Sequence, residues 1–130
     1  MNIIDKVLLN DSASIKKAME IIDTSEIKIA LVVDDSKRLI GTITDGDIRR
    51  AILKGIALSN PVKDTMNHNF IYAEVGESRE KILQLSRLNQ IHQVPIVDKD
   101  FILVGIEDTS SQLTPSKRLN KVVLMVGGLG

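Results

Sequence analysis

The sequence contains no cysteine and no tryptophan, and its aromatic residues are only one tyrosine and two phenylalanines among 130 residues. The absence of cysteine excludes disulfides, thiolate catalysis and cysteine-based zinc sites. Because aromatic side chains are so scarce, any core is expected to consist of isoleucine, leucine, valine and alanine. The same scarcity argues against a surface that binds single-stranded nucleic acid by stacking bases on aromatic rings.

The sequence also lacks an excess of charge of either sign and any long apolar run. It has 17 basic and 17 acidic residues, whereas proteins that bind duplex nucleic acid usually carry a basic excess. Residues 1–6 do not form the basic and apolar regions of a signal peptide, and no apolar run reaches the roughly 20 residues that span a bilayer. We therefore expect a soluble, cytoplasmic protein that binds neither nucleic acid nor a membrane.

The sequence matches itself when it is shifted by 64 positions. The identical residues that align without a gap include Ser14 with Ser78, Val33 with Val97, Asp34 with Asp98, and Gly41 with Gly105. Generic patterning of helices and strands can produce weak self-similarity, and few residues are identical. However, a helix, a turn and a glycine match in one register, which favours a true duplication.

Each copy begins its matched region with an amphipathic helix, over residues 14–23 and 78–87. The apolar residues at helical spacing are Ile15, Ala18, Met19 and Ile22 in the first copy and Ile82, Leu85 and Leu88 in the second. The serine that precedes each stripe, Ser14 or Ser78, is a typical N-cap. We expect these stripes to face the core of each copy.

Each helix is followed by two short apolar runs around an Asp-rich turn, a pattern that predicts a β-hairpin. The hairpins are expected over residues 29–43 and 94–106, with first strands at 7–9 and 71–73. Pro95 has no N–H group and is expected at the start of a strand or on an edge. A second short helix is expected to end at Gly55. Each copy is therefore predicted to be strand, helix, strand, strand, helix.

The segment 41–50, Gly-Thr-Ile-Thr-Asp-Gly-Asp-Ile-Arg-Arg, joins the end of a predicted strand to the start of a helix. The free N–H groups at a helix start favour a phosphate or another anion. Thr44 and Asp47 are three positions apart and can face one ligand, where a carboxylate can hold a ribose diol. Three cationic side chains are available to neutralise phosphates: Arg49, Arg50 and Lys54. The same Thr-x-x-Asp spacing also approximates a helix capping box, so both interpretations stay open.

The repeated unit, with its hydrophobic-Val-Val-Asp turn, the glycine that follows and the Gly-x-hydrophobic-Thr-x-x-Asp motif, resembles a CBS domain. Two units in tandem, over residues 1–60 and 61–115, resemble a Bateman module. The resemblance implies an α/β (α+β) fold of two β-α-β-β-α repeats packed sheet to sheet about a pseudo-twofold axis, and dimerisation. It also implies a cleft that binds an adenine nucleotide such as AMP, ADP or ATP, with no required cofactor. By this resemblance Thr44 and Asp47 contact the ribose, and Ile29, Ala30 and Leu31 flank the adenine. Ile43 is a further candidate for ligand binding.

The second copy departs from the motif, because Asp108 stands where the first copy has Thr44 and Ser111 stands where it has Asp47. We therefore expect one competent cleft, and Asp108 and Ser111 are left as candidate caps of a final helix. The two histidines, His68 and His92, lack the spacing of metal ligands, so no metal site is expected. No nucleophile with a matching base is present, so the chain itself is not expected to be catalytic.

The segment 120–130, Asn-Lys-Val-Val-Leu-Met-Val-Gly-Gly-Leu-Gly, is an apolar run that ends in glycines. Such a run is typical of a buried strand, but it also resembles the first strand of sugar-phosphate nucleotidyltransferases, where glycines let the backbone approach phosphates. We therefore expect residues 116–130 to be a linker and the first strand of a truncated nucleotidyltransferase domain, such as that of a mannose-1-phosphate guanylyltransferase-like enzyme. The chain is then a regulatory piece of that enzyme, cut from a longer protein. The alternative is a ligand-free module that only dimerises it.

Overall fold

The computed structural model describes residues 3–25, 27–109 and 120–123 and divides the chain into two compact units. One unit is Asp5–Phe70, and the main part of the other begins at Ile71. Residues 61–70 lie in the first of these compact units. Two isolated bridges hold this segment, Ser14 with Pro61 and Thr42 with Asn67.

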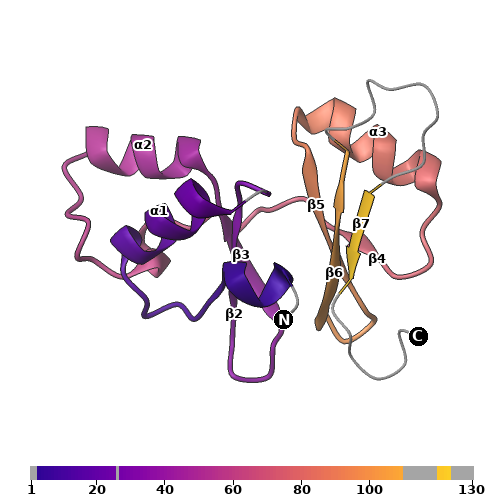
Figure 1. The fold of residues 1–130 in the computed structure, drawn as a ribbon, viewed down its shortest axis with the longest axis horizontal. Coiled ribbons are helices and arrows are strands. Elements are labelled where there is room, and N and C mark those ends of the chain that lie inside the picture. The colour runs from indigo at the N-terminus through magenta and orange to yellow at the C-terminus, as the bar shows by residue number, and fades with distance from the viewer. Residues whose placement is uncertain (1–2, 26, 110–119, 124–130) are drawn as a thin grey trace. The chain divides into compact units, whose positions relative to one another are not determined.

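The first unit has a three-stranded sheet in the order β1-β2-β3, with β1 parallel to β2 and β2 antiparallel to β3. Its elements are η1 (Ile3–Val7), β1 (Leu8–Leu9), α1 (Ile15–Thr24), β2 (Ala30–Val33), β3 (Leu39–Ile43), α2 (Asp45–Leu53) and η2 (Val62–Asp64). Figure 1 shows α1 and α2 on the same side of β2 and β3. This is the predicted order of strand, helix, strand, strand and helix.

Helix α1 begins where the sequence predicts, since the hydroxyl of Ser14 accepts the N–H of Lys17 at 3.1 Å. Its buried residues are Ile15, Ala18, Ile21 and Ile22. Met19, which we expected in the buried stripe, is 39% exposed. The expectation was wrong because the buried arc of the helix extends to the side of Ile21, which leaves Met19 at the opposite margin.

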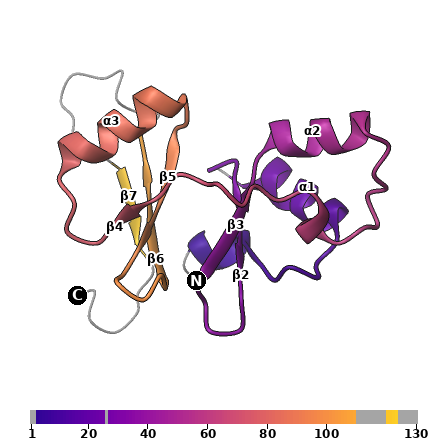
Figure 2. The same ribbon diagram turned by 180° about the vertical axis from the view of Figure 1, so that it is seen from behind.

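The second unit has a four-stranded sheet in the order β4-β5-β6-β7, with β4 parallel to β5 and the other pairs antiparallel. Its elements are β4 (Ala73–Glu74), α3 (Arg79–Asn89), β5 (Gln93–Val97), β6 (Leu103–Asp108) and β7 (Asn120–Val123), which can be followed in Figure 2. Its core comprises Ala73, Ile82, Val94, Ile96 and Val104, so α3 packs against the sheet. The final helix expected in this repeat and Ser111 lie outside the described residues.

Two expectations for the second unit were wrong. Leu88 is 72% exposed, because the buried arc of α3 extends from Ile82 to the side of Ser86, which leaves Leu88 on the opposite margin. The buried Ser86 hydroxyl is bonded to that of Thr109 at 2.6 Å. Pro95 lies in the middle of β5, which has a neighbour on each side. The position is tolerated because β4 pairs only from Ile96 onward, so β5 has no β4 partner at Pro95.

The two hairpins repeat one another in detail, which supports the duplication. The carboxylate of Asp34 accepts the N–H groups of Ser36 and Arg38, each at 2.9 Å, and that of Asp98 accepts those of Asp100 and Ile102 at 2.8 and 3.0 Å. A register irregularity follows Val32 in the first hairpin and Ile96 in the second, and each of these residues faces a glycine. The Asp-rich turns thus have the predicted turn chemistry.

Candidate functional site

The junction between β3 and α2 brings Thr44 and Asp47 together. Thr44 has an extended backbone and is the N-cap of α2, and Asp47 is in the first turn. One carboxylate oxygen of Asp47, Oδ2, accepts the backbone N–H of Thr44 at 2.9 Å and the Thr44 hydroxyl at 3.1 Å. Asp47 therefore caps the helix, as the capping interpretation requires. The same contacts hold the two side chains next to each other, as the ligand interpretation also requires.

Arg49 and Arg50 were both predicted from the sequence to bind phosphate, but only Arg50 contacts Asp47. Its Nη2 lies 2.7 Å from Asp47 Oδ1, and the Asp47 side chain is 13% exposed. Arg49 instead forms an ion pair with Asp45, and both of those side chains are largely exposed. An exposed i,i+4 pair of this kind contributes little to stability. Arg50, and not Arg49, therefore lies beside Asp47 as a candidate for binding phosphate.

Three of the apolar residues predicted for ligand binding, Ala30, Leu31 and Ile43, lie on the paired strands β2 and β3, and Ile29 directly precedes β2. Ala30 pairs with Ile43 across β2 and β3, and Leu31 pairs with Thr42. The four side chains of Ile29, Ala30, Leu31 and Ile43 are buried. In this structure they belong to the core that supports the junction, and their contact with a nucleotide stays a prediction.

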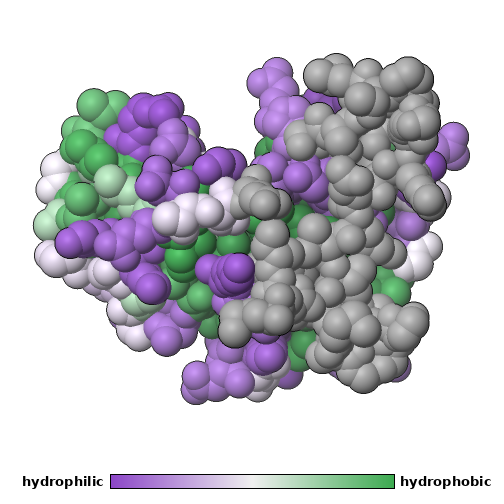
Figure 3. Space-filling view, viewed as in Figure 1, coloured by the Kyte–Doolittle hydropathy of each residue, from purple (hydrophilic) through white to green (hydrophobic). Residues whose placement is uncertain are grey.

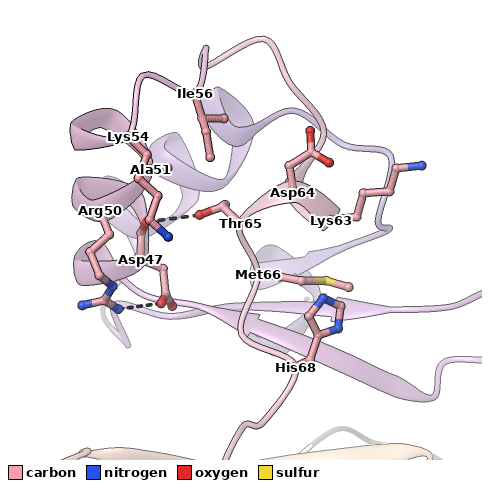
Figure 4. A pocket seen from close by; sticks show the side chains of 10 residues that line it. All are labelled: Asp47, Arg50, Ala51, Lys54, Ile56, Lys63, Asp64, Thr65, Met66 and His68. Atoms are coloured by element: carbon pink, nitrogen blue, oxygen red, sulfur yellow. Dashed lines mark hydrogen bonds and ion pairs between the residues drawn. The ribbon is translucent and has the colours of Figure 1, made fainter.

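A pocket of about 240 Å³ opens beside Asp47 (Figure 4). One wall is α2, and the other is the segment that follows it; the lining residues are Asp47, Arg50, Ala51, Lys54, Ile56, Lys63, Asp64, Thr65, Met66 and His68. The hydroxyl of Thr65 donates to the backbone carbonyl of Asp47 at 3.2 Å. Residues 63–68 could not be assigned to this site from the sequence, because they lie outside the repeated motif and reach it only through folding.

Gly41, the first residue of the motif, is required by packing at this site. A Cβ atom there would lie 2.6 Å from Sδ and 2.9 Å from Cγ of Met66. The glycine therefore lets Met66 cross β3, and the next residue, Asn67, pairs with Thr42 through two hydrogen bonds of 2.8 and 3.2 Å. The segment 65–67 thus touches both β3 and α2, the two elements that present Thr44 and Asp47.

In the second unit the corresponding junction differs in chemistry. Glu107 and Asp108, at the end of β6, stand where the first unit has Ile43 and Thr44, and Glu107 is buried. An acidic residue there would repel a nearby phosphate.

Within the residues that the structure describes, no group of three or more histidine, aspartate and glutamate side chains could hold a metal ion. In that same part of the chain, no helix is long and apolar enough to cross a membrane.

Curated relatives include inosine-5'-monophosphate dehydrogenases. That of Aquifex aeolicus is 31% identical over 105 residues, which are 80% of this chain and 21% of the relative. That of Methanocaldococcus jannaschii is 29% identical over 102 residues, which are 78% of this chain and 20% of the relative. The chain therefore spans about one fifth of the length of these relatives.

Solved structures with the same fold include a CBS domain pair in complex with 5-methylthioadenosine and S-adenosyl-L-methionine. It is 25% identical, has a TM-score of 0.72 and aligns over 87% of this chain and 94% of its own. A CBS domain protein from Pyrobaculum aerophilum complexed with AMP is 20% identical, with a TM-score of 0.70 over 83% and 87% of the two chains. The family model described as CBS domain matches residues 3–54 and 62–106. This chain belongs to the CBS domain family and is a tandem pair of CBS domains.

Proposed function

We propose that this CBS pair is a regulatory module that binds an adenine nucleotide, AMP, ADP or ATP, at the junction of β3 and α2. The observation that carries the proposal is the placement of Asp47, whose carboxylate is mostly buried and is oriented by both Thr44 and Arg50. The CBS domain pair that is 25% identical to this chain was solved in complex with 5-methylthioadenosine and S-adenosyl-L-methionine. Both ligands contain adenosine, which supports an adenosine-containing ligand for this chain.

The number of free acceptor positions on the Asp47 carboxylate determines how a ribose would bind to it. A carboxylate offers about four lone-pair positions, and Asp47 uses three of them on the Thr44 N–H, the Thr44 hydroxyl and Arg50. A ribose diol brings two O–H donors, so one hydroxyl takes the free position and the other displaces the Thr44 hydroxyl. The displaced hydroxyl is then itself free to bond the ribose. The backbone bond from Thr44 that caps α2 need not break.

The proposed mechanism is a shift of populations. A nucleotide that binds one arrangement of the pair more tightly than another stabilises that arrangement for an attached catalytic domain. Coupling of this kind is typically about 1–3 kcal/mol. The motif is complete only in the first repeat, so we expect one nucleotide per chain.

The test isolates the ribose contact. We expect AMP to bind the wild-type protein about tenfold or more tightly than 2'-deoxy-AMP, because a hydrogen bond to a charged group is lost. In Asp47→Asn the difference should shrink to a few-fold, while the asparagine oxygen can still accept the Thr44 N–H. Isothermal titration calorimetry on both proteins measures this. An equal preference for AMP in the two proteins, or no binding of AMP, ADP, ATP or S-adenosylmethionine, would refute the proposal.

For the attached domain we propose a sugar-phosphate nucleotidyltransferase. The support is the sequence of segment 120–130, with its apolar run and three glycines. The two relatives described above are dehydrogenases and do not support this choice. The codons after Gly130 test it directly, since Thr-Arg-Leu would continue the nucleotidyltransferase loop and a dehydrogenase domain would overturn it.

A second candidate function is assembly of the enzyme without any ligand. It is favoured by exposed apolar side chains at the C-terminal end of α2, where Ile52 is 51% and Leu53 is 80% exposed. Figure 3 shows hydrophobic surface over this region. If this candidate is correct, light scattering should find a dimer that Leu53→Lys dissociates, and the nucleotide panel should produce no binding. A dimer that also binds AMP would combine the two functions.

A further inference from the structure

Glu107, near the end of β6, is a carboxylate on the core side of the second sheet. It is only 4% exposed and pairs with Val94 across β5 and β6. Residues directly opposite each other in antiparallel strands share one face of a sheet, and Val94 belongs to the core that also contains Ile82 of α3. The corresponding residue of the first unit is the apolar, buried Ile43. Because burial of a carboxylate is costly without a compensating charge, the second unit favours a cation at this place.

Strand β7 brings a lysine to this place in the sheet. In the antiparallel register of β6 and β7, Lys121 stands directly opposite Glu107, and Asn120 stands opposite Asp108. Figure 1 shows β7 running alongside β6. Opposite charges at directly opposed positions of two strands favour their pairing. The register therefore places a cation across from the buried carboxylate.

The rest of the segment does not select this register. Residues 122–126 form an uninterrupted apolar run, so burial of apolar side chains does not distinguish one face of the strand from the other. A shift of β7 by one or two positions would replace the lysine opposite Glu107 with one of four uncharged residues: Leu119, Asn120, Val122 or Val123. Within segment 119–123, the observed register alone sets opposite charges against each other.

We propose that the opposite charges of Glu107 and Lys121 form a latch that fixes segment 120–123 to the edge of β6 in one register. The second repeat, whose ligand motif is incomplete, then uses the end of β6 to hold a strand. The latch itself does not depend on nucleotide binding. Its use in regulation rests on the proposed function, because the held strand would carry a change in the second unit to an attached domain.

Disulfide trapping reads the register directly, because the chain has no native cysteine. The pair Asp108→Cys/Asn120→Cys reports the observed register, since these residues are opposite each other. The pair Asp108→Cys/Val122→Cys reports a register shifted by two. Disulfides need Cα atoms within roughly 4.4–6.8 Å, whereas diagonal neighbours lie about 7–8 Å apart. In the full chain we therefore expect the first pair to cross-link about tenfold faster than the second.

Charge variants in the cross-linkable chain test the latch. Lys121→Met removes the charge and should slow the in-register cross-link about fivefold or more, because the buried carboxylate loses its opposite charge. Lys121→Arg should cross-link like the unsubstituted pair. Lys99→Met, in the exposed β5–β6 turn, is the matched control and should have no effect. Once Glu107→Gln is present, Lys121→Met should change the rate less than about twofold. Thermal unfolding verifies that each variant folds.

The outcomes separate the latch from the proposed function. If Lys121→Met slows the in-register cross-link only while Glu107 is present, the latch stands, even if no nucleotide binds and the proposed function fails. If Lys121→Met cross-links as fast as the unsubstituted pair, or is slowed equally with and without Glu107→Gln, the latch is refuted. Equal rates for the in-register and shifted pairs would refute it as well.

Discussion

The hydroxyl of Thr65 donates a hydrogen bond to the backbone carbonyl of Asp47 at 3.2 Å, although the two residues are 18 positions apart. Met66 crosses β3 at Gly41, and Asn67 pairs with Thr42. The chain segment 65–67 therefore contacts both β3, which ends just before Thr44, and α2, the helix that carries Asp47. We infer that this segment positions the site without itself belonging to the repeated motif.

Thr65→Val should remove this long-range bond while keeping the shape of the side chain. We expect the free energy of unfolding to fall by about 1 kcal/mol, the usual net contribution of one hydrogen bond. Nucleotide binding should weaken by a few-fold, because α2 loses a fixed point at Asp47. Urea denaturation and calorimetry measure the two effects.

The matched control is Thr24→Val. Its hydroxyl also donates to a backbone carbonyl, that of Glu20 at 2.9 Å, but it does so within α1. Thr24→Val should leave nucleotide binding unchanged. Equal binding by both variants would show that Thr65 has only a structural role.

Gly41→Ala should destabilise the first unit, because the added methyl group would lie 2.6 Å from the sulfur of Met66. Overpacking of this kind typically costs about 1–3 kcal/mol. Shortening the neighbour in Gly41→Ala/Met66→Ala should recover part of the loss, so the two substitutions should be non-additive in a double-mutant cycle. Chemical denaturation of the single and double variants measures the coupling.

Gly46→Ala is the control for the effect of adding a methyl group to this region. The nearest atom to its added Cβ is Nη1 of Arg50 at 3.4 Å, at the end of a flexible side chain. Because alanine is favoured over glycine in a helix by up to about 1 kcal/mol, this variant should be neutral or stabilised. Destabilisation equal to that of Gly41→Ala would contradict the packing explanation.

The parts of the fold that sequence predicted are those that depend on local chemistry. Ser14 and Ser78 cap their helices, and Asp34 and Asp98 organise their turns, because each acts on residues only two to four positions away. The exposure of Met19 could not be predicted in the same way. It depends on which arc of α1 faces the sheet, and helical spacing alone leaves that choice open.

At the candidate site, too, the contacts between residues close in sequence could be predicted, whereas those between distant residues could not. Thr44 and Asp47 could be paired from their spacing, since residues three apart meet in the first turn of a helix. Arg49 and Arg50 could not be distinguished from spacing, because each lies three or four positions after an aspartate of the same helix, and the structure pairs only Arg50 with Asp47. Thr65 carried no recognisable signal, since its partner is distant in the sequence.

The carboxyl of Glu77, just before α3, should make stability depend on pH in the acidic range. The backbone N–H of Glu74, which donates to it at 3.0 Å, holds its pKa below the usual value, and Lys81 at 3.3 Å acts in the same direction. A depressed folded-state pKa means that the stabilisation is complete above the unfolded-state pKa, about 4.3 for glutamate. It is lost as the pH falls through the lower folded-state value.

Glu77→Gln should therefore lower the free energy of unfolding at pH 7 and flatten its decline between neutral and acidic pH. Glu20→Gln, on α1, is the control. Its free energy of unfolding should decline with falling pH as that of the wild type does. Urea denaturation at a series of pH values measures this. A decline in Glu77→Gln as steep as that of the wild type would contradict the assignment.

The buried hydroxyls of Ser86 and Thr109 should be energetically coupled. They lie 2.6 Å apart, and Ser86 donates to the carbonyl of Ile91. Thr109 has a single hydroxyl proton, which it donates either to Ser86 or to the carbonyl of His92 at 3.3 Å. Either Ser86→Ala or Thr109→Val alone leaves a buried hydroxyl short of a partner and should cost about 1–3 kcal/mol. The double variant should cost less than the sum, because no hydroxyl remains to be satisfied. Additive costs in a double-mutant cycle would show that the bond between α3 and the end of β6 contributes nothing of its own.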